Sequence, residues 1–191
     1  MDVSLVEGSE GSITLKAEEN ILEYIEMTSN NGKLRIKTKD YVNLRPSWKE
    51  GIHIEIPVEE VSKISLNGSG EIKGALTLKT AKLKLSVSGS GDIKVAADAM
   101  AIKAAISGSG DIDVSGKADA LEASVTGSGD INAKSLKVNN ATAHITGSGD
   151  ITAHAKNLIS VKIVGSGDVH VNRDVATTNK KVVGSGSINK Y

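Results

Sequence analysis

Apolar and polar residues alternate along most of the chain, in short runs that each lead into a Gly-Ser-Gly tripeptide. Two residues before the first glycine, the side chain is always aliphatic: Leu66, Val87, Ile106, Val125, Ile145, Ile163 and Val182. Four residues before it come Ile64, Leu85, Ala104, Ala123, Ala143, Val161 and Lys180. The position between these two carries Ser65, Ser86, Ala105, Ser124, His144, Lys162 and Lys181. Such alternation predicts strands with one apolar face.

The tripeptide recurs at a nearly fixed interval. It begins at Gly68, Gly89, Gly108, Gly127, Gly147, Gly165 and Gly184, with gaps of 21, 19, 19, 20, 18 and 19 residues. An acid or a serine and then Ile or Val follow each copy, and the alternation resumes, as at Ile93 and Val95. A fixed period of this length is typical of stacked repeats. Each unit is therefore expected to be a strand, a tight glycine turn, a strand and a looser turn, the last absorbing the changes in length.

Two strands per unit cannot bury their apolar face alone. Stacked at ~4.8 Å, the units would form two parallel sheets that face each other across ~10 Å. Inward alanines such as Ala104 and Ala123, and the absence of Phe, fit a narrow interior. The sequence therefore predicts an all-β fold, with a parallel β-helix (a two-sheeted β-solenoid) over residues 61–191. The hand of parallel crossover connections predicts a right-handed coil.

Residues 1–60 lack the repeat but contain alternating runs at 12–16, 21–27, 34–38 and 51–57. They predict a β-rich N-terminal cap, continuous with the solenoid, so that the chain is one structural unit. Asn30-Asn31-Gly32, between two of these runs, predicts a β-hairpin. At the other end, Lys180 occupies an inward position and the repeat stops after its last turn. We expect an open strand edge there, which a second copy of the chain could cover in a homo-oligomer.

Composition narrows the classes of partner and chemistry. The chain has 23 basic and 23 acidic residues and no net charge, which argues against nucleic acid or an anionic membrane surface. It has no Cys and only four aromatic residues, one Trp and three Tyr, so it has no disulfides and no aromatic stacking groove. No apolar run is long enough for a transmembrane segment. The first residues contain no export signal, which leaves either a cytosolic protein or one whose signal has been removed.

The repeated Gly-Ser-Gly units, each with its following acid and Ile or Val, come after a Gly-Ile-His-Ile-Glu-Ile-Pro-Val strand at 51–58. Together they resemble the putative auto-transporter adhesin head domain family, the GIN-domain proteins of bacterial envelopes. The resemblance covers nearly the whole chain. It implies a two-sheeted β-helix, export to the cell envelope or beyond in Bacteroidetes-like Gram-negative bacteria, and a role in adhesion. It implies no catalytic residues and no cofactor.

The acids after the turns should form a ladder along one edge of the stack: Asp92, Asp111, Asp130, Asp150 and Asp168. Carboxylates ~4.8 Å apart repel by about 1 kcal/mol per pair in water, so something must offset the repulsion. The favoured hypothesis is that each Asp accepts N–H bonds from its own turn. The alternative is a row of hard cations such as Ca²⁺, although the nine-residue signature of calcium-binding β-rolls is missing.

Serine and histidine offer little chemistry. A serine nucleophile elbow has its glycines two residues away on either side, whereas the glycines here adjoin the serine. These serines are therefore expected to be turn residues: Ser69, Ser90, Ser109, Ser128, Ser148, Ser166 and Ser185. The four histidines share no metal-binding spacing, so surface strand positions are expected for all of them: His53, His144, His154 and His170.

Two further groups are candidates for ligand contact. Tyr41, Arg45 and Trp48 cluster in an irregular segment, where they either contact a glycan or peptide or supply a Trp that plugs the open end of the core. Five residues before the turn glycine, an outward row begins with three lysines in succession. These would face carboxylates such as Asp98, or solvent. The row is Lys63, Lys84, Lys103, Glu122, Thr142, Ser160 and Asn179.

These features favour a non-enzymatic protein of the cell envelope or surface, an adhesin that contacts glycans or proteins. Two alternatives stay open. A β-helix carbohydrate-active enzyme would need two carboxylates, one of them with a raised pKa. A periplasmic protein-interaction module would act through an open sheet edge. No catalytic residue, metal or cofactor is assigned.

Overall fold

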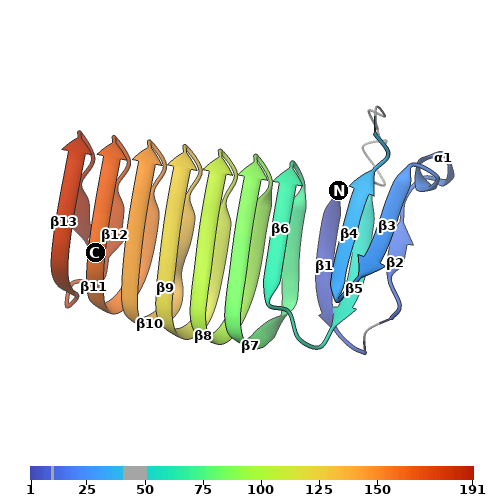
Figure 1. Cartoon of the computed structure of the whole chain (residues 1–191), viewed down its shortest axis with the longest axis horizontal. Coiled ribbons are helices and arrows are strands. Elements are labelled where there is room, and N and C mark those ends of the chain that lie inside the picture. Colours follow the sequence, from blue (N-terminus) through green and yellow to red (C-terminus); the bar gives the residue numbers. More distant parts are fainter. Residues whose placement is uncertain (10, 41–50) are drawn as a thin grey trace.

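The computed structural model describes residues 1–9, 11–40 and 51–191. In Figure 1 they form a row of stacked coils with a more irregular N-terminal end. Among these residues, no helical segment has the length and hydropathy of a membrane span. The elements are β1 (Asp2–Glu7), β2 (Thr14–Lys16), α1 (Glu19–Leu22), β3 (Ile25–Asn30), β4 (Lys33–Thr38), β5 (His53–Val58), β6 (Lys63–Gly68), β7 (Glu71–Gly89), β8 (Asp92–Gly108), β9 (Ile112–Gly127), β10 (Ile131–Gly147), β11 (Ile151–Gly165), β12 (Val169–Val171), β13 (Ala176–Gly184) and β14 (Ile188–Lys190).

The Gly-Ser-Gly turns lie directly over one another. The first glycine of each turn is the register partner of the first glycine in the next, from Gly68–Gly89 through to Gly165–Gly184. All of these coil-to-coil pairings are parallel, and they join β6 to β14 with β1 and β5 in one sheet. The predicted parallel β-solenoid is therefore confirmed, while its right hand stays a prediction.

Each long strand runs around a corner and forms both walls of its coil. In β8, Ile93, Val95 and Ala97 are buried on one side of the corner, and Ile102 and Ala104 on the other. The inward residues of β8 have odd numbers up to Ala97 and even numbers from Ile102 onward, so the alternation shifts by one residue at the corner. Side chains of one strand thus face each other across the interior.

The looser turn expected at 97–99 and 115–117 is not a break, because β8 and β9 continue through it with regular pairing. Changes in repeat length are instead absorbed by irregularities elsewhere. One lies in β7 between Lys73 and Thr77, and another lies in β10 between Asn132 and Leu136. An extra residue in a strand is accommodated as a bulge, which local alternation does not reveal.

The core is a continuous stack of aliphatic side chains, and none of the described residues with a polar or charged side chain is buried. Leu85, Ile112 and Ile145 lie 1% exposed or less in the central coils, with alanines such as Ala104 and Ala143 beside them. Neighbouring coils cover each layer. Burial of this kind is the main source of stability, because each coil alone would leave its apolar face in water.

Both glycines of a turn are required, for reasons that overlap only in part. Gly108, the first of its turn, has φ +135°, a conformation that side chains rarely adopt. Gly110, the third, has no such φ, but a Cβ there would collide with the carbonyl oxygen of Gly91 in the preceding coil. The N–H groups of Ser109 and Gly110 both donate to the carbonyl of Gly89, at 2.8 and 3.1 Å. A Cβ on Gly108 would also collide with the carbonyl oxygen of Gly89, so the first glycine is needed for both the turn and the stacking, and the third for the stacking alone.

Residues before the first repeat complete and cover the N-terminal end of the stack. The strand β1 was not predicted, yet it pairs in parallel with both β5 and the start of β7. The outermost strand, β2, pairs antiparallel with β5. The predicted hairpin is confirmed: β3 and β4 pair antiparallel around Asn31 and Gly32, which have φ 49° and 69°.

Two details of this region differ from the predictions. The strand expected at 21–27 begins only at Ile25, because Ile21 and Leu22 belong to α1. Ile21 packs in a small apolar cluster with Ile52 and Ile54, and this tertiary contact fits a helical turn that alternation alone does not suggest. Pro57 does not end its strand, since β5 continues to Val58.

The C-terminal coil is less covered than the others. In β13, Val182 is 41% exposed, whereas its register partner Ile163 in β11 is fully buried. Lys180 is also exposed, although the matching residues of inner coils point into the core. In the described part of the chain, β13 pairs only with β11, and β14 only with β12. The expected open edge is therefore present in the structure.

Candidate functional site

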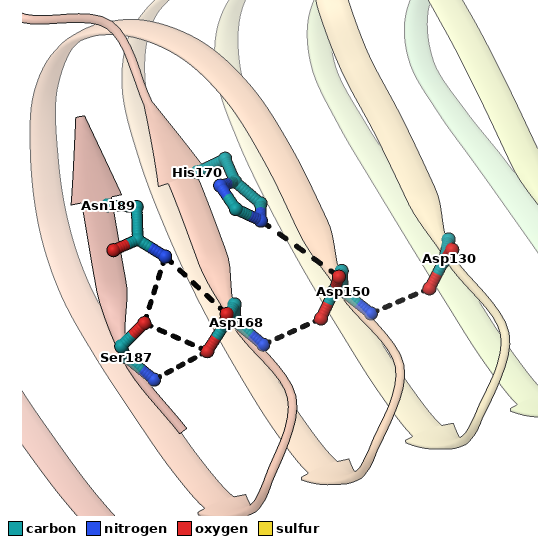
Figure 2. A network of polar contacts seen from close by, with 6 residues as sticks. All are labelled: Asp130, Asp150, Asp168, His170, Ser187 and Asn189. Atoms are coloured by element: carbon teal, nitrogen blue, oxygen red, sulfur yellow. Dashed lines mark hydrogen bonds and ion pairs between the residues drawn. The ribbon is translucent and has the colours of Figure 1, made fainter. Parts of the chain in front are cut away.

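The row of aspartates after the turns forms a chain of hydrogen bonds that runs from coil to coil (Figure 2). The Oδ1 atom of Asp111 accepts the backbone N–H of Asp130 at 2.9 Å, and Oδ1 of Asp130 accepts that of Asp150 at 2.7 Å. The same contact links Asp92 to Asp111 and Asp150 to Asp168, at 3.0 and 2.7 Å. The favoured hypothesis was wrong in one respect: each carboxylate accepts an N–H from the next coil, not from its own turn.

These contacts make the aspartate row part of the stacking. The backbone carbonyl of Asp111 also accepts the N–H of Ile93 in the preceding coil, at 2.9 Å. Each aspartate thus bonds to the coil on either side of it. A hydrogen bond to a charged acceptor is stronger than one between neutral groups, so it offsets repulsion between neighbouring carboxylates.

The first coil differs from the later ones at this position. Glu71 occupies it there, and its longer side chain pairs with Lys73 at 2.7 Å. The N–H of Asp92 in the next coil then donates to the carbonyl of Gly70 at 2.9 Å, not to the Glu71 carboxylate. The backbone of this turn differs as well, since Gly70 has φ 123° whereas the third glycines of the later turns have no positive φ.

Asp168 ends the row with additional contacts (Figure 2). Its Oδ1 accepts the N–H of Ser187 at 2.7 Å and the Ser187 hydroxyl at 2.9 Å, while Oδ2 accepts from Asn189 at 3.5 Å. The backbone N–H of Ser187, followed by its hydroxyl, holds the pKa of Asp168 below its usual value. His170 lies beside the row, with Nε2 3.9 Å from Oδ2 of Asp150.

Asp168→Asn is expected to destabilise the protein at neutral pH but not in acid. Because folding lowers the pKa of Asp168, its charge contributes stability above the unfolded-state value of 3.8, and this is lost as pH falls through the folded-state value. Asn keeps an oxygen that can accept the Ser187 N–H bond, so the comparison isolates the charge. Urea unfolding of both proteins from neutral pH down to about 2.5 measures the difference, which should shrink below about 4.

Asp174→Asn is the matched control, since Asp174 is exposed and none of the described residues forms a hydrogen bond or ion pair with its side chain. Its stability should follow that of the wild type throughout. A constant difference between wild type and Asp168→Asn across the whole pH range would contradict the assigned role of the Asp168 charge.

The other residues proposed from the sequence do not assemble into a reactive site. The described residues contain no group of three or more His, Asp or Glu side chains arranged to hold a metal ion. All seven serines of the Gly-Ser-Gly turns are exposed. His53 lies at the N-terminal end, 3.9 Å from Asp2, far in sequence from His144, His154 and His170. Tyr41, Arg45 and Trp48 lie outside the described residues.

Shallow grooves occur on the outer faces of the described residues, and two of them lie on opposite walls. One, of about 560 Å³, crosses several coils on the wall that leads into the Gly-Ser-Gly turns and includes Lys82, Lys84, Lys103, Ala101 and Ala120. The other, of about 410 Å³, lies on the opposite wall beside the bulges of β7 and β10. The sequence prediction of outward rows included Lys84 and Lys103 but missed Lys82. The sequence signal that could have revealed Lys82 is the outward row two residues before the predicted one, in which Lys82 is followed by Ala101 and Ala120.

The carboxylate partners of these lysines differ from those predicted. Asp98 pairs with Lys117 of the next coil at 3.0 Å. Lys63 and Lys84 lie on other coils than Asp98. Lys103 pairs with Glu122 of the next coil. For the ammonium groups of Lys63, Lys82 and Lys84, no ion pair or hydrogen bond occurs with any part of the chain that the structure describes.

Comparison with known proteins gives the family and the fold. A family model described as "putative auto-transporter adhesin, head GIN domain" matches residues 1–174, whereas no curated protein matches the sequence. A putative adhesin from Bacteroides fragilis NCTC 9343 is similar in structure, with a TM-score of 0.83 at 24% identity, over 100% of this chain and 88% of the other.

Two structures from Parabacteroides distasonis ATCC 8503 are also similar. A putative lipid binding protein has a TM-score of 0.78 at 23% identity, covering 100% of this chain and 88% of that one. A putative adhesin has a TM-score of 0.77 at 21% identity, covering 100% of this chain and 89% of that one. At these identities the structural likeness shows the fold alone. The family match extends from β1 to beyond β12, and the chain therefore belongs to the family of the putative auto-transporter adhesin head GIN domain.

Proposed function

We propose that this protein is a non-enzymatic scaffold of the bacterial cell envelope or surface, whose outer faces contact glycans or proteins. The observation that carries the proposal is the regularity of those faces. Polar side chains repeat from coil to coil, and no polar or charged side chain is buried among the described residues. Active sites typically shift a pKa by burying a charged group, whereas an adhesive surface needs accessible, repeated contacts.

The names of the family and of two structural neighbours support an adhesin-like surface protein. Glycans or proteins as targets are our inference from the exposed rows. Self-association is a further part of the proposal, because the edges of β13 and β14 are open and Val182 is 41% exposed. Sedimentation velocity at increasing concentration tests it, and a monomer throughout would contradict it.

The aspartate row argues against the enzyme alternative. Glycoside hydrolysis needs two carboxylates with different protonation states on either side of the scissile bond. Asp111, Asp130 and Asp150 instead make the same contact in successive coils, each with one oxygen engaged by the next N–H. With the same oxygen of each engaged in the same way, no member of the row is set apart as the acid or as the base.

A binding screen combined with an activity screen tests the proposed function. The intact protein is expected to bind at least one member of an array of glycans and extracellular-matrix proteins, and a heat-unfolded sample is expected not to. Polyuronides and neutral polysaccharides incubated with the protein should keep their chain length. Catalytic turnover would overturn the non-enzymatic assignment, and a folded protein that binds nothing on the array would overturn adhesion.

A further inference from the structure

The larger groove runs along the stack, across the strands. Its lining begins at Ser62, passes Lys82 and Lys84, and ends at Asn140 and Thr142. These residues belong to five successive coils, so the groove spans roughly 19 Å at ~4.8 Å per coil. Its direction and length suit an extended chain molecule better than a compact ligand.

Small side chains form the floor of the groove, and lysines line its side. Ala101 and Ala120 are register partners in neighbouring coils, and Lys82 precedes them in the same row. Two residues further along each strand, Lys84 and Lys103 project from the same face. The small side chains leave space between the flexible lysine stems, and the ammonium groups reach solvent at the rim.

The cationic row contains like-charge repulsion that contacts among the described residues offset only at Lys103. Lys63 is the register partner of Lys84, and Lys84 is that of Lys103. Like charges at this spacing repel by about 1 kcal/mol per pair in water. Only Lys103 has an acidic partner among the described residues, namely Glu122.

Nearby acids are engaged elsewhere. Glu60 accepts a hydrogen bond from Thr80 at 3.4 Å, and Asp119 accepts one from Asn139 at 3.0 Å. The aspartate row at the turns shows the contrast, because there every neighbouring pair is joined by a hydrogen bond. Apart from Lys103, which pairs with Glu122, the lysine row is thus a like-charge ladder without a counterpart among the described residues, and an anionic ligand would supply one.

We propose that this groove binds a linear polysaccharide that carries carboxylate groups, such as a uronic-acid glycan. The carboxylates lie over Lys82, Lys84 and the neighbouring Lys63, and the sugar rings lie along Ala101 and Ala120. Asn140 and Thr142 donate and accept hydrogen bonds to hydroxyl groups at the other end. The inference rests on the proposed adhesive function and names its target class.

The spacing favours a glycan over an acidic peptide. One pyranose of an extended polysaccharide is close in length to one coil step of ~4.8 Å, so successive sugars can meet successive coils. Side chains on one face of an extended peptide recur at ~6.8 Å, which does not match. Strand addition is also excluded within this wall, because its backbone groups are already paired between coils.

Affinity for a single groove should be modest and dependent on salt. Ion pairs at exposed lysines are weak, and added salt screens them. Many copies on one cell surface would bind a polymer much more strongly than one copy does, as multivalent attachment requires.

Isothermal titration with oligogalacturonates, in buffer free of divalent cations, tests the proposal. The double variant Lys82→Gln/Lys84→Gln should lose affinity by about five- to tenfold. The matched control Lys94→Gln/Lys162→Gln removes the same charge, one lysine from the opposite wall and one from the same wall outside the groove, and should bind as the wild type does. Binding should disappear near about 1 M salt, where the Debye length is about 3 Å.

Stability separates a binding role from a structural one. Lys84→Gln removes repulsion with both Lys63 and Lys103, so its melting temperature should equal or exceed that of the wild type while binding falls. A clear loss of stability in Lys84→Gln would overturn the assignment of Lys84 as a ligand contact.

The remaining outcomes separate a failure of the proposed ligand class from a failure of the proposed function. Equal loss of affinity in the two double variants would overturn the groove as the site. Stronger binding of poly-glutamate, or binding of dextran sulfate without binding of oligogalacturonate, would overturn a carboxylated glycan. If the protein binds other glycans or matrix proteins on the array but no uronate, this inference fails and the proposed adhesion stands. If it binds nothing, both fail.

Discussion

Gly129→Ala should lower the free energy of unfolding by about 3 kcal/mol or more, measured by urea or thermal unfolding. Gly129 is the third residue of its turn and is buried. A Cβ at this position would lie far inside van der Waals contact with the carbonyl oxygen of Gly110 in the preceding coil, and against Ile106. The obstacle on one side is backbone, so no change of side-chain rotamer relieves it. The two coils must separate or the turn must tilt.

Ser128→Ala is the matched control for this variant. Ser128 lies between the two glycines of the same turn, is exposed, and holds the preceding coil through its backbone N–H, which donates to Gly108 at 2.9 Å. Alanine keeps that bond, so the change in stability should stay within about 0.5 kcal/mol. Similar unfolding curves for the two variants would contradict the view that close stacking requires the third glycine.

Ile145→Ala should cost about 2–5 kcal/mol. Ile145 is 1% exposed in the centre of the stack. It is the register partner of Val125 on one side and Ile163 on the other. Because the coil spacing is fixed by backbone hydrogen bonds, neighbouring side chains cannot close the cavity left by the missing atoms, and the full cost is expected in chemical denaturation.

Val182→Ala tests the same row at the end of the stack. Val182 occupies the position equivalent to Ile145 but is 41% exposed. Truncation there removes little buried surface and leaves no enclosed cavity, so it should cost less than about 1 kcal/mol. Comparable losses at the two positions would show that the terminal coil is as well covered as the central ones, against the structure.

The coils could be predicted because each repeats one local rule. Alternation sets which side chains face inward, and the glycines after Val87, Ile106 and Val125 set where the chain reverses. Because the period holds through the array, stacking the coils is the arrangement that buries the apolar side chains of every layer. These are local signals, and every repeat reinforces them.

The N-terminal end could not be predicted to the same extent, because it depends on pairing between distant segments. The strand β1 occupies a place between β5 and β7, which follow it by about fifty residues or more. Nothing in its own alternation specifies that place. Ile21 likewise lies in a helical turn because of contacts with Ile52 and Ile54. Tertiary contact overrides local pattern in both cases.

The candidate surfaces were predictable only as rows of residue types. The sequence indicates that aspartates align, but an Asp can accept an N–H from its own turn or from the next coil, and the choice depends on backbone geometry at the corner. The groove depends on Lys82 and Ala101 lying side by side in neighbouring coils. That relation requires the register to hold around the corner, where the sequence had suggested a loose turn.

The pairing of β8 with β9 keeps one constant offset from Ile93–Ile112 to Gly108–Gly127, without a bulge. A segment of one period between them can therefore be duplicated or deleted with the inward-facing side chains still meeting aliphatic neighbours. Tandem duplication of the gene segment would lengthen the molecule in increments of ~4.8 Å. The length of the stack can therefore change during evolution by one coil at a time.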